Sequence, residues 1–129
     1  MIDHMGIAVS DASRSRAFYE AALAPLGMSC RTTVTADQTD SGGTAHGFGA
    51  EGHGEFWIAD NERVGEGTHV AFRAETRAQV DGFHQAALAA GGRDNGAPGL
   101  RPHYGPNYYA AFVHDPGGHN IEAVCYAEG

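Results

Sequence analysis

The feature that most constrains the fold of this chain is an internal repeat with an offset of 65 residues. Residues 4–27 align without a gap on residues 69–92, and seven of the 24 positions are identical. Three of the seven are alanines in an alanine-rich chain, so the histidine, phenylalanine, leucine and glycine matches carry the argument. A repeated unit buries its apolar face against its neighbour. We therefore expect the 129 residues to form one domain built from two similar units.

Each unit shows the same order of local patterns. An alternating stretch comes first, which is typical of a strand with two different faces. A helical periodicity follows, capped by Asp11 or Ser13 in the first unit and by Thr76 in the second. Later strands are expected near residues 28–35, 45–50, 54–60, 92–96, 107–114 and 119–126. The pattern predicts an α+β domain of two βαβββ modules in tandem, residues 1–62 and 66–127.

The charge of the chain narrows the choice of partners. Eight arginines, no lysine and sixteen acidic residues leave a net charge of −8. A surface of this sign repels nucleic-acid phosphates and anionic lipids, so we expect neither nucleic acid nor a membrane as a partner. The first residues lack the basic and apolar regions of a signal peptide, and no apolar run is long enough to span a bilayer. These features favour a cytoplasmic protein that binds a small molecule.

Three side chains on the expected strands are candidates for metal binding. The repeat makes His4 and His69 equivalent, and both stand among small residues on one face of the first strand of their unit. Glu122 points away from the face that carries Ile121 and Ala123, and an acid in the middle of a strand needs a partner or a metal to tolerate burial. Two imidazoles and one carboxylate suit iron(II), or a catalytic zinc or manganese ion. We therefore predict His4, His69 and Glu122 as metal ligands.

Four longer stretches of the sequence, residues 3–11, 16–19, 69–72 and 112–122, carry a resemblance to a known family. They resemble the vicinal oxygen chelate superfamily. This superfamily includes glyoxalases, extradiol dioxygenases, fosfomycin-resistance thiol transferases and bleomycin-resistance proteins. The resemblance spans nearly the whole chain, and its closing Asp-Pro-x-Gly-x-x-x-Glu pattern is fairly specific for the superfamily.

The resemblance implies a glyoxalase/dioxygenase-like fold and a metal site. The two modules would form a cupped mixed sheet around a divalent metal ion, with His4, His69 and Glu122 matching three ligand positions. The ion would be iron, manganese, zinc or nickel, and the habits of the superfamily suggest a homodimer. The site would lie either within one chain or between two.

The fourth ligand position of the superfamily is not matched. Glyoxalase I has a glutamate or glutamine there, and the alignment of residues 55–58 on residues 120–123 places Trp57 at this position. Tryptophan does not bind metals, so the four-ligand activities lose support unless Glu55 reaches in through a bulge. Relatives with three ligands, the dioxygenases and the fosfomycin transferases, fit better.

Further residues are candidates for substrate binding and catalysis. Trp57 is either a wall of the pocket or part of the core, because aromatic residues are common in both. Arg73 shares a strand face with His69 and either binds an anionic substrate group or pairs with an acid. The polar, aromatic loop 101–109 either supplies an acid, a base or a hydrogen bond to the substrate, or is simply solvated. The predicted catalytic residues are Glu122, His103 and Tyr108, and the predicted substrate-binding residues are Trp57, Arg73 and Tyr104.

Two functions of different classes remain open. The first is a metal-dependent enzyme, glyoxalase- or dioxygenase-like, in which the metal chelates oxygen atoms of a small substrate. The second is a metal-free protein of the bleomycin-resistance type that sequesters a small, cationic molecule, which the net charge of −8 and the missing fourth ligand favour. The other histidines are predicted to be bystanders: His46, His53, His84, His114 and His119.

Overall fold

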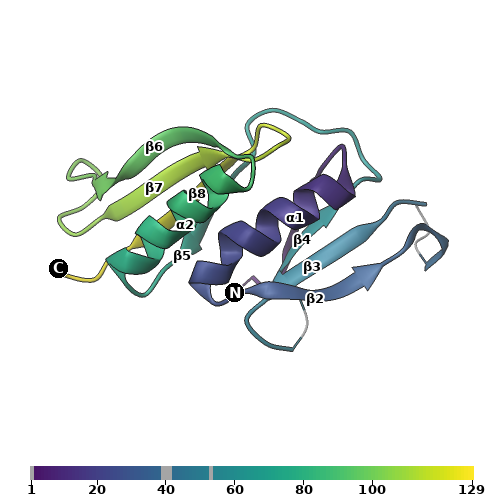
Figure 1. Cartoon of the computed structure of the whole chain (residues 1–129), viewed down its shortest axis with the longest axis horizontal. Coiled ribbons are helices and arrows are strands. Elements are labelled where there is room, and N and C mark those ends of the chain that lie inside the picture. The colour runs from purple at the N-terminus through teal and green to yellow at the C-terminus, as the bar shows by residue number, and fades with distance from the viewer. Residues whose placement is uncertain (1, 39–41, 53) are drawn as a thin grey trace.

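The structure, a computed structural model, describes residues 2–38, 42–52 and 54–129. Two α-helices lie side by side in front of the strands, with a sheet extending to each side (Figure 1). The first half contains β1 (Met5–Ala8), α1 (Ala12–Leu23), η1 (Ala24–Leu26), β2 (Ser29–Val34), η2 (Ala36–Gln38), β3 (Ala45–Gly49) and β4 (Phe56–Ala59). The second half contains β5 (His69–Arg73), α2 (Arg77–Ala89), β6 (Arg93–Leu100), β7 (Tyr109–His114) and β8 (Asn120–Cys125).

Each half forms its own four-stranded mixed sheet. The strand order is β1-β4-β3-β2 in the first sheet and β5-β8-β7-β6 in the second. In both, the first strand runs parallel to the last one, and the other neighbours are antiparallel. The predicted fold class, α+β with two βαβββ modules, is confirmed.

The two sheets also share their register, which is the strongest structural sign of the repeat. Gly6 lies beside Trp57 in the first sheet, and Ala71 lies beside Glu122, each 65 positions later, in the second. The same offset relates every residue pair between β3 and β4 to a pair between β7 and β8. The outer strands β2 and β6 depart from it, at irregular positions in both sheets. Trp57 therefore occupies the place in the first module that Glu122 occupies in the second.

The helices begin at predicted capping residues and cover one side of the sheets. The side chain of Asp11 accepts a hydrogen bond from the N–H of Arg14 at 3.0 Å, and that of Thr76 accepts one from the N–H of Gln79 at 3.1 Å. Among the described residues, no helix has the length and apolar character needed to cross a membrane. α1 packs on β2, β3 and β4, α2 packs on β6, β7 and β8, and the helices pack on each other. The opposite side of both sheets is left without a helix (Figure 1).

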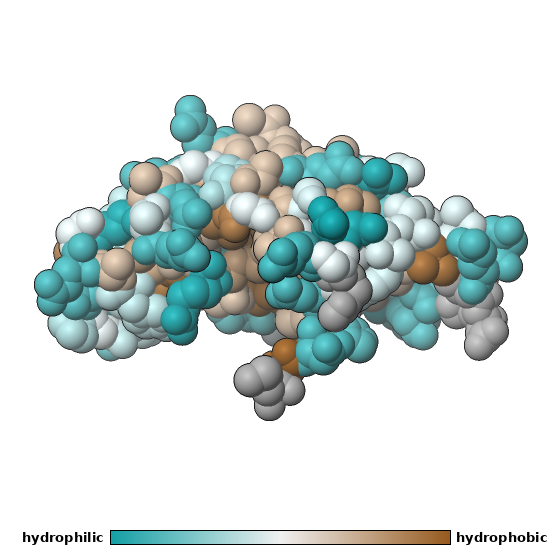
Figure 2. Space-filling view, turned by 90° about the horizontal axis from the view of Figure 1, so that it is seen from below, coloured by the Kyte–Doolittle hydropathy of each residue, from teal (hydrophilic) through white to brown (hydrophobic). Residues whose placement is uncertain are grey.

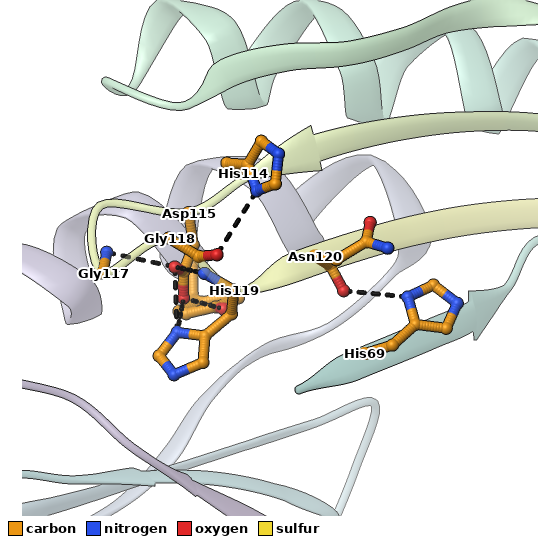
Figure 3. A network of polar contacts seen from close by, with 8 residues as sticks. His69, His114, Asp115, Gly117, Gly118, His119 and Asn120 are labelled. Carbon is orange, nitrogen blue, oxygen red and sulfur yellow. Dashed lines mark hydrogen bonds and ion pairs between the residues drawn. The ribbon is translucent and has the colours of Figure 1, made fainter. Parts of the chain in front are cut away.

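A buried polar network joins the two halves. The Tyr19 hydroxyl, on α1, donates a hydrogen bond to the Asp115 carboxylate at 2.6 Å. Asp115 lies in the β7–β8 turn and also accepts hydrogen bonds from Nδ1 of His119 at 2.8 Å and from the N–H groups of Gly117 and His119 (Figure 3). Burial and the Asp115 carboxylate raise the pKa of Tyr19 well above its ordinary value. The network fixes the turn before β8 against the first half of the chain.

Candidate functional site

The centre of the candidate site is Glu122, a buried carboxylate on β8. Its neighbours Ile121 and Ala123 belong to the core, so Glu122 points to the side of the sheet away from α2. Only 2% of Glu122 is exposed. A carboxylate in such a place needs hydrogen bonds or a cation to offset the loss of water.

Two side chains contact this carboxylate. His69, on the adjacent strand β5, places its Nε2 3.1 Å from Oε1 of Glu122. The Tyr108 hydroxyl, just before β7, donates a hydrogen bond to Oε2. Burial and the hydrogen bond to Glu122 raise the pKa of Tyr108 well above its ordinary value, so the hydroxyl keeps its proton at neutral pH. Three of the predicted site residues thus lie together.

The second nitrogen of His69 determines the form of its ring. Nδ1 lies 3.0 Å from the backbone oxygen of Asn120 (Figure 3). A carbonyl oxygen can only accept a hydrogen bond, so Nδ1 carries a proton. In the neutral ring, Nε2 then presents a lone pair to the Glu122 carboxylate, which is also an acceptor. Either a second proton on the ring or a cation bound by both atoms makes this contact favourable.

A hollow of about 420 Å³ opens over His69 and Glu122. The His69 ring is stacked on that of Phe112, with 6.3 Å between the ring centroids, and its side chain is 44% exposed. A small molecule in the hollow can therefore reach the imidazole. The lining residues are His69, Tyr104, Tyr108, Phe112, Asn120 and Glu122.

The third predicted ligand, His4, lies elsewhere. Its side chain is 61% exposed, and its Nδ1 is 2.7 Å from the carboxylate of Asp3. Across residues 2–38, 42–52 and 54–129, no three His, Cys, Asp or Glu side chains are grouped closely enough to hold a metal ion. One chain in this conformation therefore brings His69 and Glu122 together but does not bring His4 to them.

His4 instead borders a hollow between the two halves. This hollow of about 320 Å³ is lined on one side by residues 2–5, which include His4 and the start of β1, and on the other by β5 residues 70–73, which include Arg73. Hydrophobic side chains are recessed within a largely hydrophilic surface on the face shown in Figure 2. The Arg73 guanidinium stacks on the Tyr126 ring, 4.8 Å from its centroid. The Tyr126 ring is in turn 5.3 Å from the ring of Tyr108. Tyr126 therefore lies between Arg73 and Tyr108, whose hydroxyl contacts Glu122.

The 101–109 loop contributes to the hollow over Glu122 through its aromatic residues. The Tyr104 ring is 5.3 Å from that of Tyr108 and forms one wall, although 62% of Tyr104 is exposed. His103 packs on the outer side of this wall, with its ring 4.1 Å from the ring of Tyr104. Within the described chain, His103 does not line the hollow.

Trp57 is held at the surface of the first sheet. A Cβ atom at Gly47 would lie only 2.7 Å from the indole ring, so the ring rests directly on the backbone of β3. The indole Nε1 donates a hydrogen bond to the backbone oxygen of Gly54 at 3.1 Å. Glu55 is exposed and continues the regular ladder, because its oxygen accepts from the N–H of Met5. A bulge that would bring Glu55 inward is not formed.

Several residues that shape the site were not predicted. Phe112 lies opposite Glu122 in the β7–β8 hairpin and supports His69. The tight Asp-Pro-Gly-Gly turn contains the signal for it, because the length of that turn sets the pairing. Two histidines predicted to be bystanders to the site lie in the interior, where His119 is buried on Asp115 and His46 is buried beside Thr33. The prediction for His53 lies outside the described residues.

Comparison with known proteins decides the family. The Glyoxalase/Bleomycin resistance protein/Dioxygenase superfamily matches residues 1–123. The chain belongs to this superfamily. No curated protein matches it.

Solved structures of the superfamily share the fold of nearly the whole of this chain. A glyoxalase/bleomycin resistance protein from Albidiferax ferrireducens T118 is 28% identical, with a TM-score of 0.75 over 96% of this chain and 97% of that one. A glyoxalase/bleomycin resistance protein/dioxygenase family enzyme from Burkholderia phytofirmans PsJN is 18% identical, with a TM-score of 0.69 over 98% of each chain. Glyoxalase I from Zea mays is 22% identical, with a TM-score of 0.73 over 98% of this chain and 45% of that one. The two matches below 25% identity, from Burkholderia phytofirmans and Zea mays, show a likeness of fold alone.

The donor set of this superfamily member fits a metal ion in part. His69 has its Nδ1 hydrogen fixed by a backbone carbonyl, which is one of the common arrangements of metal-binding histidines. The Glu122 carboxylate faces the free nitrogen from the adjacent strand. An imidazole and a carboxylate suit iron, manganese, zinc or nickel, but each of these needs at least one more protein ligand.

Proposed function

We propose that the chain is a divalent-metal-dependent enzyme that acts on a small substrate with chelating oxygen atoms. The observation that carries this proposal is the contact between Nε2 of His69 and Oε1 of Glu122 at 3.1 Å, with Nδ1 of His69 committed to Asn120. A cation bound by both atoms would make the contact between the Nε2 lone pair and the buried carboxylate favourable, as would a second proton on the ring. When bound, the metal would supply Lewis-acid chemistry at a substrate oxygen.

The residues around the metal would each have a defined task. His69 and Glu122 would hold the ion. The Tyr108 hydroxyl, which donates to Glu122, would fix the direction of the carboxylate and supply a hydrogen bond to a substrate that displaces this contact. Tyr104 would exclude water on the open side of the hollow. His103, on the outer side of Tyr104, would act only after a movement of the loop.

The third ligand would come from a second copy of the chain. β1 and β5 are both edge strands of their sheets, and His4 stands at the exposed start of β1. A homodimer that brings the β1 end of one chain to the β5 edge of the other would add His4 of the partner subunit to His69 and Glu122. Such a site would bury three ligands that one chain alone does not bring together.

Metal analysis of the purified protein tests the proposal. The wild type is expected to bind one divalent ion per chain, and His69→Ala and Glu122→Gln are expected to lower the affinity at least about 100-fold, because each removes a direct ligand. His103→Ala is the matched control and should bind metal like the wild type. Equal affinity in all three variants would exclude this metal site.

Mixing two inactive variants tests the shared site. If the site lies between two chains, every mixed dimer of His4→Ala and His69→Ala contains one intact site and one site that lacks both histidines. Mixing should therefore restore metal binding at one of the two sites in each mixed dimer. If the site lies within one chain, no mixed dimer contains an intact site and binding stays absent. Thermal stability of both variants, measured beforehand, separates a lost ligand from a lost fold.

A second function is favoured by Trp57 and the net charge of −8. A metal-free protein that binds a small cationic molecule needs an aromatic surface and acidic surroundings more than it needs ligands. Protein that holds no metal after dialysis against zinc and manganese, yet binds such a molecule saturably, would support this alternative. Stoichiometric metal binding that withstands dialysis would exclude it.

A further inference from the structure

The first module carries a fixed aromatic platform on the side of its sheet away from α1. Phe56 and Ile58, on either side of Trp57 in β4, are buried in the core, so the indole points to the opposite side. Its lower face rests on Gly47 and its Nε1 is hydrogen bonded to Gly54. The ring therefore has one orientation before any ligand arrives, and little side-chain entropy is lost on binding.

Space is available on both sides of this indole. A hollow of about 530 Å³ lies between Trp57, Gly6 and Gly54 at the end where His4 stands. A second hollow, of about 240 Å³, lies between Trp57, Gly6 and Ala59 at the other end. Gly6, Ala8 and Ala59 have no side chain or a small one, so they leave space beside the indole. A flat group can therefore lie against the indole ring.

The charges around the platform select the ligand. Asp3 lines the first hollow together with His4, whose Nδ1 contacts the Asp3 carboxylate at 2.7 Å, and Glu62 lines the second. Among the described residues that line the two hollows, none is an arginine, and the chain has no lysine. An indole face attracts cations through its quadrupole, and acidic residues at both ends add to this attraction. An anionic ring would be repelled at the same place.

We infer that Trp57 is the stacking site for a planar, positively charged aromatic ring, such as an N-alkylated heteroaromatic group, carried by the ligand. This inference rests on the proposed function only in taking the open side of the sheets as the ligand side. It needs no metal at Trp57. The equivalent position in the second module holds Glu122, so the two modules offer one stacking group and one charged group.

The only tryptophan of the chain makes the inference directly measurable. N-methylquinolinium is the probe, and the saturated N,N-dimethyldecahydroquinolinium and neutral quinoline are matched controls. With wild-type protein in EDTA, the probe is expected to quench tryptophan fluorescence saturably, and its proton NMR signals should shift upfield because the ring current of the indole acts on them. The saturated cation and neutral quinoline are each expected to bind about tenfold more weakly, because one lacks the ring and the other the charge.

Substitutions separate stacking from general attraction. Both Trp57 variants lack tryptophan, so their affinity is measured by NMR titration of the probe. Trp57→Leu is expected to weaken binding about tenfold and to abolish the upfield shift, whereas Trp57→Phe, which keeps a ring, should lose about threefold. The double variant Asp3→Asn, Glu62→Gln should lose about fourfold while keeping the shift. Both Trp57 variants are compared by circular dichroism, and Trp57→Phe carries the test if Trp57→Leu does not fold.

Three results would overturn the inference. The first is unchanged probe affinity in Trp57→Phe and Trp57→Leu. The second is that the saturated cation binds as tightly as N-methylquinolinium and that the probe signals do not shift upfield. The third is probe binding that disappears at concentrations where the chain dimerises, because a second copy would then cover Trp57. Failure of the metal proposal appears separately, as loss of metal binding with the quenching intact.

Discussion

The β3–β4 and β7–β8 hairpins have the same backbone register but opposite chemistry. In the first, the glycine at position 47 lies opposite Trp57, and the aromatic ring fills the place above it. In the second, Phe112 lies opposite Glu122, and the carboxylate is the smaller partner. The larger residue therefore lies on the last strand of the first module, as Trp57, and on the strand opposite it in the second module, as Phe112. The comparison teaches that this backbone tolerates either a platform or a charged group, provided that the residue across the hairpin compensates in volume.

The turns of the two hairpins differ in the same way, and the largest effect is expected there. Asp115 is replaced in the first module by Ala50, which is exposed and makes no such network. Asp115→Ala gives the second turn the residue of the first. It should lower the free energy of unfolding by about 3–5 kcal/mol, because the buried Tyr19 hydroxyl and His119 ring lose their acceptor.

Urea unfolding measures this effect against a matched pair on the surface. Tyr109 donates a hydrogen bond to the exposed Asp81 at 2.6 Å, with the same chemistry as Tyr19 and Asp115. Asp81→Ala should cost about 1 kcal/mol or less. Equal losses in the two variants would show that the network does not join the halves.

An intermediate effect is expected at Gly47, where an added methyl group would meet the indole. Gly47→Ala should lower the free energy of unfolding by about 1–3 kcal/mol, because its Cβ would lie 2.7 Å from ring atoms of Trp57. Displacement of the ring into water should also move the tryptophan emission to longer wavelength. Gly65→Ala is the control, since a Cβ there meets nothing within 4 Å. Unchanged emission in Gly47→Ala would mean that the ring does not rest on β3.

The smallest effect concerns pH and the pair His46 and Ala111, which are equivalent in β3 and β7. Burial, together with the nearby Arg16 charge, lowers the pKa of His46 below its ordinary value of 6.5. As the pH falls through 6.5, the unfolded chain takes up a proton before the folded chain does, so stability present at higher pH is lost. His46→Ala removes this contribution.

The free energy of unfolding at pH 7.5 and 5.5 tests the sign. The stability difference between wild type and His46→Ala should shrink by up to about 1 kcal/mol on going to the lower pH. A difference that grows on acidification would contradict a lowered pKa.

The sequence predicts the features that depend on local pattern and repetition. The 65-residue offset leads from Phe18 to Phe83 and from Trp57 to Glu122, and both equivalences follow from the repeat in the sequence. The closeness of His69 and Glu122 could also be predicted, because β5 and β8 belong to the same module and are neighbouring strands.

Features that depend on how the halves pack are not contained in that pattern. The repeat makes His4 in the first module equivalent to His69 in the second. This equivalence does not determine how the modules pack, so it does not bring the two histidines together, and His4 contacts Asp3 instead. The contact of Tyr19 with Asp115 spans 96 positions and has no counterpart in the first module. No periodicity encodes such a contact, because it is set by the angle between α1 and α2.

The network of Tyr19, Asp115 and His119 has a consequence for the autonomy of the halves. A chain cut near residue 65 would leave the Tyr19 hydroxyl on one fragment and its acceptor Asp115 on the other. The surfaces that bury these two side chains would then be exposed to water. Neither fragment would then be a self-sufficient folding unit, although both contain a complete βαβββ topology. The two repeated halves are therefore expected to unfold together as a single cooperative unit.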